Sequence, residues 1–138
     1  MTNPLFDLSG CTAIVTGAGR GLGAEMAKAL ALAGANVVVA ARTPDGINAT
    51  ASAITATGGA ALAVTCDATQ RGDVEALIAD AVKRFGRLDI MVNNAGYTWD
   101  NVIQKMSVEQ FQAVVDVHLV APFRILKAAA EPMRAAAK

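Results

Sequence analysis

Four short apolar runs alternate with longer, alanine-rich segments, and this alternation constrains the fold more than any other feature. The runs are residues 11–16, 36–40, 60–65 and 88–92. Each is about as long as a typical strand and is apolar at consecutive positions, as in strands covered on both faces. Because the segments between the runs have helical character, the pattern predicts an α/β fold with a doubly wound parallel sheet and right-handed crossovers.

The three segments between the runs differ in the strength of their helical pattern. The first and third have apolar residues at helical spacing and end at Gly34 and Gly86, where a helix is expected to stop. The second, residues 44–57, is rich in threonine and gives a weaker signal. All three are still expected to be helices that connect parallel strands.

The last part of the chain is also expected to be helical. Ser107 and Gln110 have the spacing of a capping box, in which Ser107 is the N-cap and Gln110 the third helical residue. Pro122 predicts a break or a kink, because proline cannot donate a main-chain hydrogen bond. Residues 123–137 have helical composition again, with Pro132 as an interruption.

Composition narrows the class of protein. The 138 residues suit one domain, 1–138, and 54% of them are hydrophobic, which argues against disorder. Twelve basic and twelve acidic residues give zero net charge, and the absence of a basic cluster argues against nucleic acid and acidic membranes as partners. No apolar run is long enough to span a membrane, and the first residues do not resemble a signal peptide. Cys11 and Cys66 are isolated, so we expect a reducing cytoplasm, no disulfide and no metal site.

The strongest local signal is the glycine-rich segment Thr16-Gly-Ala-Gly-Arg-Gly-Leu-Gly23, which lies between the first predicted strand and the first predicted helix. Glycines permit a tight turn and let main-chain N–H groups approach a pyrophosphate, while the helix N-terminus adds free donors. A flexible connector is the alternative explanation of such a segment. The position between strand and helix favours a dinucleotide-binding loop of the Rossmann type.

The end of the second run bears on the choice of cofactor. An acidic residue at this point would bind the adenosine ribose of NAD, whereas this chain has Ala41-Arg42-Thr43. An arginine can form two charge-assisted hydrogen bonds with a 2′-phosphate, and Arg20 in the glycine loop adds a second positive charge. Two solvated surface arginines are the alternative. Together, the two positions favour NADP over NAD.

Two motifs in register make the chain resemble the short-chain dehydrogenase/reductase family over residues 5–138. They are Thr16-Gly-x-x-x-Gly21-x-Gly23 after the first run and Asn93-Asn-Ala-Gly96 after the fourth. Within the family, residues 96–107 and 111–123 look like the 3-oxoacyl-acyl-carrier-protein reductase branch. The resemblance implies a sheet of strand order 3-2-1-4, with the cofactor in the crevice between strands 1 and 4.

The resemblance also implies a set of cofactor-binding residues. Asp67 would contact the adenine, although an acid that begins the following helix is an alternative role for it. Asn93 to Gly96 would line the cofactor with main-chain atoms and hold the strand in place. The full set is Gly17, Arg20, Gly21, Leu22, Gly23, Arg42, Asp67, Ala68, Asn93, Ala95 and Gly96.

The family's catalytic residues have no counterpart here. Family members transfer a hydride between nicotinamide and a carbonyl or alcohol carbon, using a Ser and a Tyr-x-x-x-Lys pair. Tyr97 is the one tyrosine, and Asn101 stands four residues after it. A further family residue, an Asn, would fall at His118, to which we assign no catalytic role. No catalytic residue and no metal ligand is therefore predicted in this chain.

A sheet that stops after four strands leaves residues 88–92 as an edge strand, which favours pairing with another chain. We therefore expect the chain to dimerise, swap, aggregate or need a complementary segment. A homo-oligomer would use this edge and the C-terminal helices.

Three functional hypotheses stay open at this point. In the first, the chain is the NADP(H)-binding half of an oxidoreductase that reduces a carbonyl such as a 3-oxoacyl thioester. In the second, it is one chain of a split enzyme. In the third, it is a nucleotide-binding or interaction module without enzymatic activity.

Overall fold

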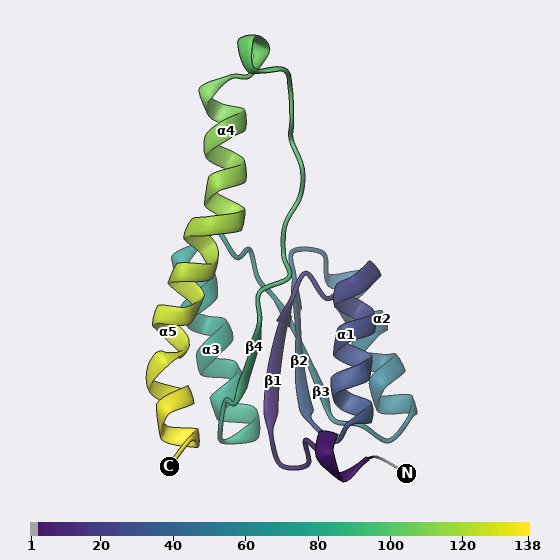
Figure 1. The fold of residues 1–138 in the computed structure, drawn as a ribbon. Coiled ribbons are helices and arrows are strands. Elements are labelled where there is room, and N and C mark those ends of the chain that lie inside the picture. The colour runs from purple at the N-terminus through teal and green to yellow at the C-terminus, as the bar shows by residue number, and fades with distance from the viewer. Residues whose placement is uncertain (1–2) are drawn as a thin grey trace.

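The computed structural model describes residues 3–138, in which strands and helices alternate as the sequence predicts (Figure 1). The four strands are β1 (Thr12–Thr16), β2 (Asn36–Ala41), β3 (Ala61–Thr65) and β4 (Ile90–Val92). The five α-helices are α1 (Gly21–Leu32), α2 (Pro44–Ala56), α3 (Arg71–Phe85), α4 (Val108–Val115) and α5 (Ala121–Ala136). Two short 3-10 turns, η1 (Pro4–Phe6) and η2 (Ile103–Lys105), and a π-helical turn, η3 (Asp116–Val120), complete the elements.

The strands form one parallel sheet in the order β3-β2-β1-β4, which confirms the predicted Rossmann-type topology. Helices α1 and α2 cover one face of the sheet, and α3 and α5 cover the other (Figure 1). In β1, side chains point alternately into the two layers, so that Ala13 and Val15 join one core cluster and Ile14 the other. No helix among residues 3–138 is long and apolar enough to cross a membrane.

The expectation that all four strands are buried on both faces holds only for the two central ones. Every residue of β1 is buried, as are the four inner residues of β2, whereas β3 and β4 are only partly buried. The reason is position, since β3 and β4 are the two edges of the sheet. The fourth strand is also shorter than predicted, because only Ile90 to Val92 pair with β1.

The two prolines of the last segment do not end it, which corrects the sequence-based expectation. Pro122 lies in the first turn of α5, where a missing N–H is tolerated, and α5 continues through Pro132. The irregularity lies just before Pro122, in the π-helical turn η3. There the Ala121 N–H donates to the oxygen of Asp116, five residues earlier.

Helix α4 begins with the predicted capping box and projects beyond the carboxyl ends of the strands (Figure 1). The Gln110 N–H donates to Ser107 Oγ at 3.1 Å, and the Ser107 N–H donates to Gln110 Oε1 at 3.1 Å. The segment 93–107 rises beside α4 without regular structure except for η2.

Candidate cofactor site

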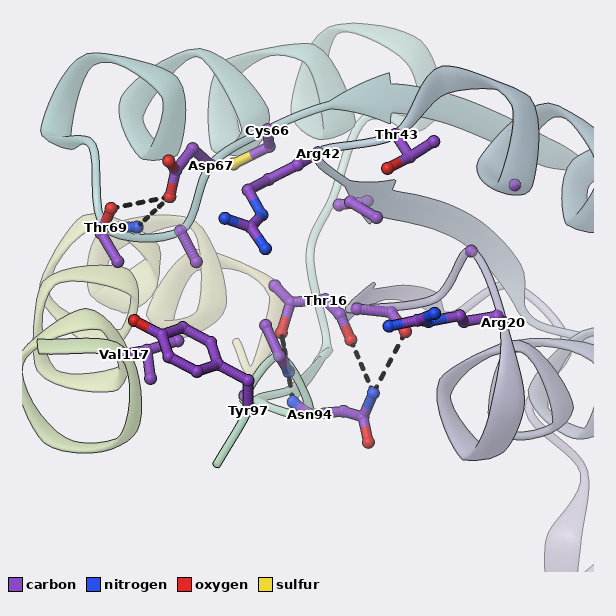
Figure 2. A pocket seen from close by; sticks show the side chains of 18 residues that line it. Thr16, Arg20, Arg42, Thr43, Cys66, Asp67, Thr69, Asn94, Tyr97 and Val117 are labelled. Atoms are coloured by element: carbon purple, nitrogen blue, oxygen red, sulfur yellow. Dashed lines mark hydrogen bonds between the residues drawn. The ribbon is translucent and has the colours of Figure 1, made fainter. Parts of the chain in front are cut away.

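A cavity of about 440 Å³ opens at the carboxyl ends of β1, β2 and β4 (Figure 2). Such a position, where the strand order reverses, is where parallel α/β sheets bind ligands. The cavity brings together seven of the predicted site residues: Gly17, Arg20, Arg42, Asp67, Ala68, Ala95 and Gly96. The other four predicted residues, Gly21, Leu22, Gly23 and Asn93, are not part of its lining.

The glycine loop connects β1 to α1 by a turn that only glycine accommodates well. Gly17 and Gly21 have φ of +64° and +57°, in the left-handed region. Gly23 faces the carbonyl of Gly17 so closely that an added Cβ would overlap it. Gly21 and Gly23 therefore shape the loop and the start of α1, which explains why they lie outside the cavity wall. Leu22 is 79% exposed and is not part of the cavity lining.

The first turn of α1 lies next to the cavity, because the residue that precedes it is part of the cavity lining. Arg20 is the N-cap of α1, and its side chain makes no capping hydrogen bond. The N–H groups of the first turn of α1 thus receive no side-chain acceptor from this residue. A helix N-terminus of this kind, next to a glycine loop, can bind a phosphate group.

Asn94 joins the carboxyl ends of β1 and β4. It lies within the predicted segment 93–96, although its side chain was not singled out from the sequence. Its side-chain amide donates to the main-chain oxygens of Thr16 at 3.0 Å and Gly17 at 3.3 Å (Figure 2). Thr16 Oγ1 accepts from the N–H groups of Asn94 at 3.1 Å and Ala95 at 3.0 Å. Asn93 is exposed. Because residues alternate direction at a strand end, the second asparagine of the pair faces the loop.

Two arginines supply positive charge to the part of the cavity near the end of β2 and the glycine loop. Arg42 follows β2 and extends into the opening, and Arg20 lies on the opposite side of it from Tyr97 (Figure 2). Neither guanidinium takes part in the ion pairs found within residues 3–138. Thr43 and Gly46 complete this corner, where α2 approaches the glycine loop; a Cβ on Gly46 would lie 2.7 Å from the Gly19 oxygen.

The third side of the cavity follows β3. Asp67 Oδ1 accepts from the Thr69 N–H at 2.9 Å and from Thr69 Oγ1 at 2.7 Å, which fixes the turn after the strand. The acidic residue in the first turn of α3 is Asp73, so Asp67 is not the acid that begins this helix. Cys66 is buried beside them. Burial, together with the Asp73 and Asp67 carboxylates, raises the pKa of the Cys66 thiol to about 11 and keeps it neutral.

The side of the cavity opposite Arg20 is formed by residues after β4 and by the π turn. Tyr97 and Val117 line it, and His118 Nε2 lies 2.8 Å from the main-chain oxygen of Tyr97. The Tyr97 hydroxyl donates to the Ala113 oxygen at 3.4 Å. The described residues contain no group of three side chains suited to hold a metal ion.

Comparison with known proteins decides the family. The family model described as short chain dehydrogenase matches residues 11–138. The chain belongs to the short-chain dehydrogenase family. The glycine loop and the Asn93–Gly96 motif are thus explained as family features, and the sheet, its strand order and the crevice are those expected of a short-chain dehydrogenase.

Individual members of the short-chain dehydrogenase family align over most of this chain. A 3-oxoacyl-[acyl-carrier-protein] reductase of Synechocystis sp. is 39% identical over 127 residues, which are 91% of this chain and 51% of that protein. A 3beta-hydroxysteroid dehydrogenase of Eggerthella lenta is 42% identical over 118 residues, 85% of this chain and 45% of the relative. The chain thus spans about half the length of the curated relatives it matches.

A solved structure of a family member has the same fold as this chain. A metagenomic short-chain oxidoreductase in complex with NADP superposes with a TM-score of 0.88 at 38% sequence identity. The match covers 94% of this chain and 59% of that one.

Proposed function

We propose that residues 1–138 form the NADP(H)-binding domain of a short-chain oxidoreductase. The observation that supports this most is the crevice itself, where a glycine loop, an uncapped first helical turn and two arginines face one opening. Neither arginine belongs to the ion pairs seen within residues 3–138. The dimensions and charge of the crevice suit a pyrophosphate and a phosphorylated ribose. The NADP complex of the metagenomic relative supports the same choice of cofactor.

Each side of the crevice has a proposed role. The glycine loop and the start of α1, with Gly17, Gly21, Leu22 and Gly23, bind the pyrophosphate through main-chain N–H groups. Arg42 and Arg20 bind the 2′-phosphate, and NADP is therefore preferred over NAD. Asp67 and Ala68 contact the adenine. Residues 93–96 support the cofactor with main-chain atoms, including those of Asn93, Ala95 and Gly96.

The proposed reaction is reduction of a carbonyl by hydride transfer from the nicotinamide. A 3-oxoacyl thioester is the proposed substrate class, supported by the similarity to the Synechocystis reductase. The chain supplies the binding half of this chemistry. Tyr97, the one tyrosine, has Asn101 rather than a lysine four residues later and donates to a main-chain oxygen. We propose that the Ser, Tyr and Lys of the reaction lie outside residues 1–138, and that the enzyme acts in the cytoplasm.

Association through β4 completes the proposal. β4 pairs with β1 on one side only, and its three residues are partly buried. A free parallel edge of this kind favours pairing with another segment or another copy. A split enzyme or a nucleotide-binding module without enzymatic activity would use the same edge and the helices α4 and α5.

Titration of the purified chain with NADPH and NADH, with light scattering on the same sample, tests the proposal. Saturable binding with NADPH preferred is the expected result. Preference for NADH would contradict the role given to Arg42 and Arg20 but not the cofactor site. A folded, monodisperse sample that binds neither nucleotide would contradict the proposed function of the isolated chain and favour an interaction module.

A further inference from the structure

The ring of His118 packs against Gly96 on the side of the crevice that Tyr97 lines. His118 belongs to the π turn η3, and its Nε2 lies 2.8 Å from the Tyr97 oxygen. A carbonyl oxygen only accepts, so this hydrogen bond requires a proton on Nε2. The imidazole ring thereby comes to lie against the main chain of the preceding residue, Gly96.

The nearest obstacle to a side chain at position 96 is the ring of His118. The three atoms nearest to an added Cβ all belong to the imidazole: Nδ1 and Nε2 at 3.1 Å, and Cε1 closer still. The φ of Gly96 is outside the left-handed region, unlike those of Gly17 and Gly21. Its backbone would therefore accept another residue, and the His118 ring is the first group that an added side chain would meet.

The main chain after β4 is thus held at two points. Asn94 is bound to Thr16 and Gly17 on β1 and the glycine loop, and Tyr97 is bound to His118 on the π turn. Between these two points lies Gly96, which lines the crevice. The position of this part of the wall therefore depends on the π turn as well as on the sheet.

We propose that His118 is a positioning residue for the cofactor crevice. Its Nε2–H holds the Tyr97 carbonyl, and its ring supports Gly96, so that residues 95–97 keep the spacing from the glycine loop that a dinucleotide needs. The proposal rests on the proposed function for the identity of the ligand, NADP(H). The resemblance places an Asn at this position in the family. An Asn side chain is shorter, and its amide nitrogen would reach about as far as Nδ1, not Nε2.

A substitution series at position 118 tests the role of the Nε2 donor. The amide nitrogen of Gln can reach the place of Nε2, whereas Asn and Ala cannot. We expect His118→Ala and His118→Asn to raise the Kd for NADPH about three- to tenfold, the usual effect of one lost hydrogen bond. His118→Gln should restore binding to within about twofold of the original chain. The neighbouring Leu119→Ala, whose side chain is 68% exposed, is the matched control and should bind normally. Normal binding by His118→Ala, or a Gln variant as weak as the Ala variant, would overturn the proposal.

A double-mutant cycle tests the fit between Gly96 and the ring. Gly96→Ala should weaken NADPH binding and lower the melting temperature, because its methyl group overlaps the imidazole. The same change made in the His118→Ala chain should cost much less, because the overlapping atoms are gone. Strictly additive effects of the two changes would show that the residues are independent and would overturn the proposal.

A cofactor-free measurement separates this proposal from the proposed function. The ¹⁵N chemical shifts of the His118 ring report which nitrogen is protonated in the neutral form. The proposal predicts Nε2–H, and it predicts faster exchange of the residue 95–97 amides in His118→Ala. Nδ1–H as the neutral tautomer would overturn it. If these signals agree but the original chain binds no NADPH, the proposed function fails while the contact stands.

Discussion

The side-chain amide of Asn94 donates to the main-chain oxygen of Thr16 at 3.0 Å, and the Thr16 hydroxyl accepts in return from the Asn94 main chain at 3.1 Å. Thr16 is the last residue of β1, and Asn94 follows the end of β4 by two residues; these two strands border the crevice. This reciprocal pair therefore fixes the width of the opening as well as the pairing of the shortest strand. Asn93, by contrast, has an exposed side chain.

Asn94→Ala removes the amide donor and leaves the Thr16 and Gly17 oxygens without it. We expect the free energy of unfolding to fall by about 1–3 kcal/mol, the usual cost of leaving partly buried polar groups unsatisfied. Urea denaturation measures this loss. Asn93→Ala is the matched control: its side chain is exposed, and its unfolding curve should stay close to that of the original chain. Equal effects of the two substitutions would contradict the assignment of the structural role to Asn94.

Gly23→Ala places a methyl group against the Gly17 carbonyl, which cannot move without opening the glycine loop. We expect a loss of about 1–3 kcal/mol in stability, as for other overpacked sites, together with weaker dinucleotide binding. Gly72→Ala in α3 is the opposite case. An added Cβ there meets no atom within 4 Å and the φ is not positive, so the substitution should stabilise by about 0.4–1 kcal/mol. Thermal unfolding of the two variants checks both signs.

Arg42→Ala is expected to remove the preference for NADPH. Charge-assisted hydrogen bonds to phosphate contribute about 1.5–3 kcal/mol, so the Kd for NADPH should rise about 10- to 100-fold. The Kd for NADH should change little, because NADH lacks the 2′-phosphate. Arg20→Ala should show the same selectivity with a smaller effect. Arg134→Ala at the exposed end of α5 controls for the general loss of a positive charge. An equal loss for both nucleotides would place Arg42 at the pyrophosphate instead.

Because the pKa of the Cys66 thiol is raised, we expect the folded chain to lose stability in alkaline solution. The pKa of this thiol is raised to about 11 by burial and by two carboxylates, above the value of about 8.5 for a free thiol. The native state thus favours the neutral thiol. This contribution is complete below the unfolded pKa and is lost as the pH rises from about 9 to 11.

The comparison with Cys66→Ala isolates this contribution from all other effects of alkaline solution on stability. The stability of the original chain should fall more steeply between pH 9 and pH 11 than that of Cys66→Ala. Cys11→Ala should behave like the original chain. In addition, Cys66 should react slowly with a thiol reagent at pH 8 until the chain unfolds. Parallel stability curves for all three chains would show that Cys66 ionises normally.

Patterns that repeat along the chain predicted the fold well. The four apolar runs and the glycines that end the helices were enough for the parallel sheet, because strand burial and helix termination are local properties. The strand order and the crevice were predicted from the resemblance to the short-chain dehydrogenase/reductase family. Seven of the eleven proposed cofactor residues line one cavity, because the carboxyl ends of parallel strands meet at one edge of the sheet. The sequence did not distinguish the side-chain roles of Asn93 and Asn94, because the direction of a side chain after a strand depends on where pairing stops. Pro122 was misread because it lies in the first turn of α5, where a missing N–H is tolerated, and Pro132 because tertiary packing keeps α5 intact around it.

The π turn η3 has the effect of one residue inserted into an otherwise continuous helix. One extra residue rotates everything before it by about 100° relative to α5. Deleting a single residue within 116–120 would straighten the hydrogen-bond ladder but turn α4 and the His118 ring away from their present directions. Such a chain would have a more regular helix, but His118 would no longer face the main chain that follows β4. The π turn η3 therefore sets the rotation of α4 relative to α5, which differs from the rotation in a uniform helix.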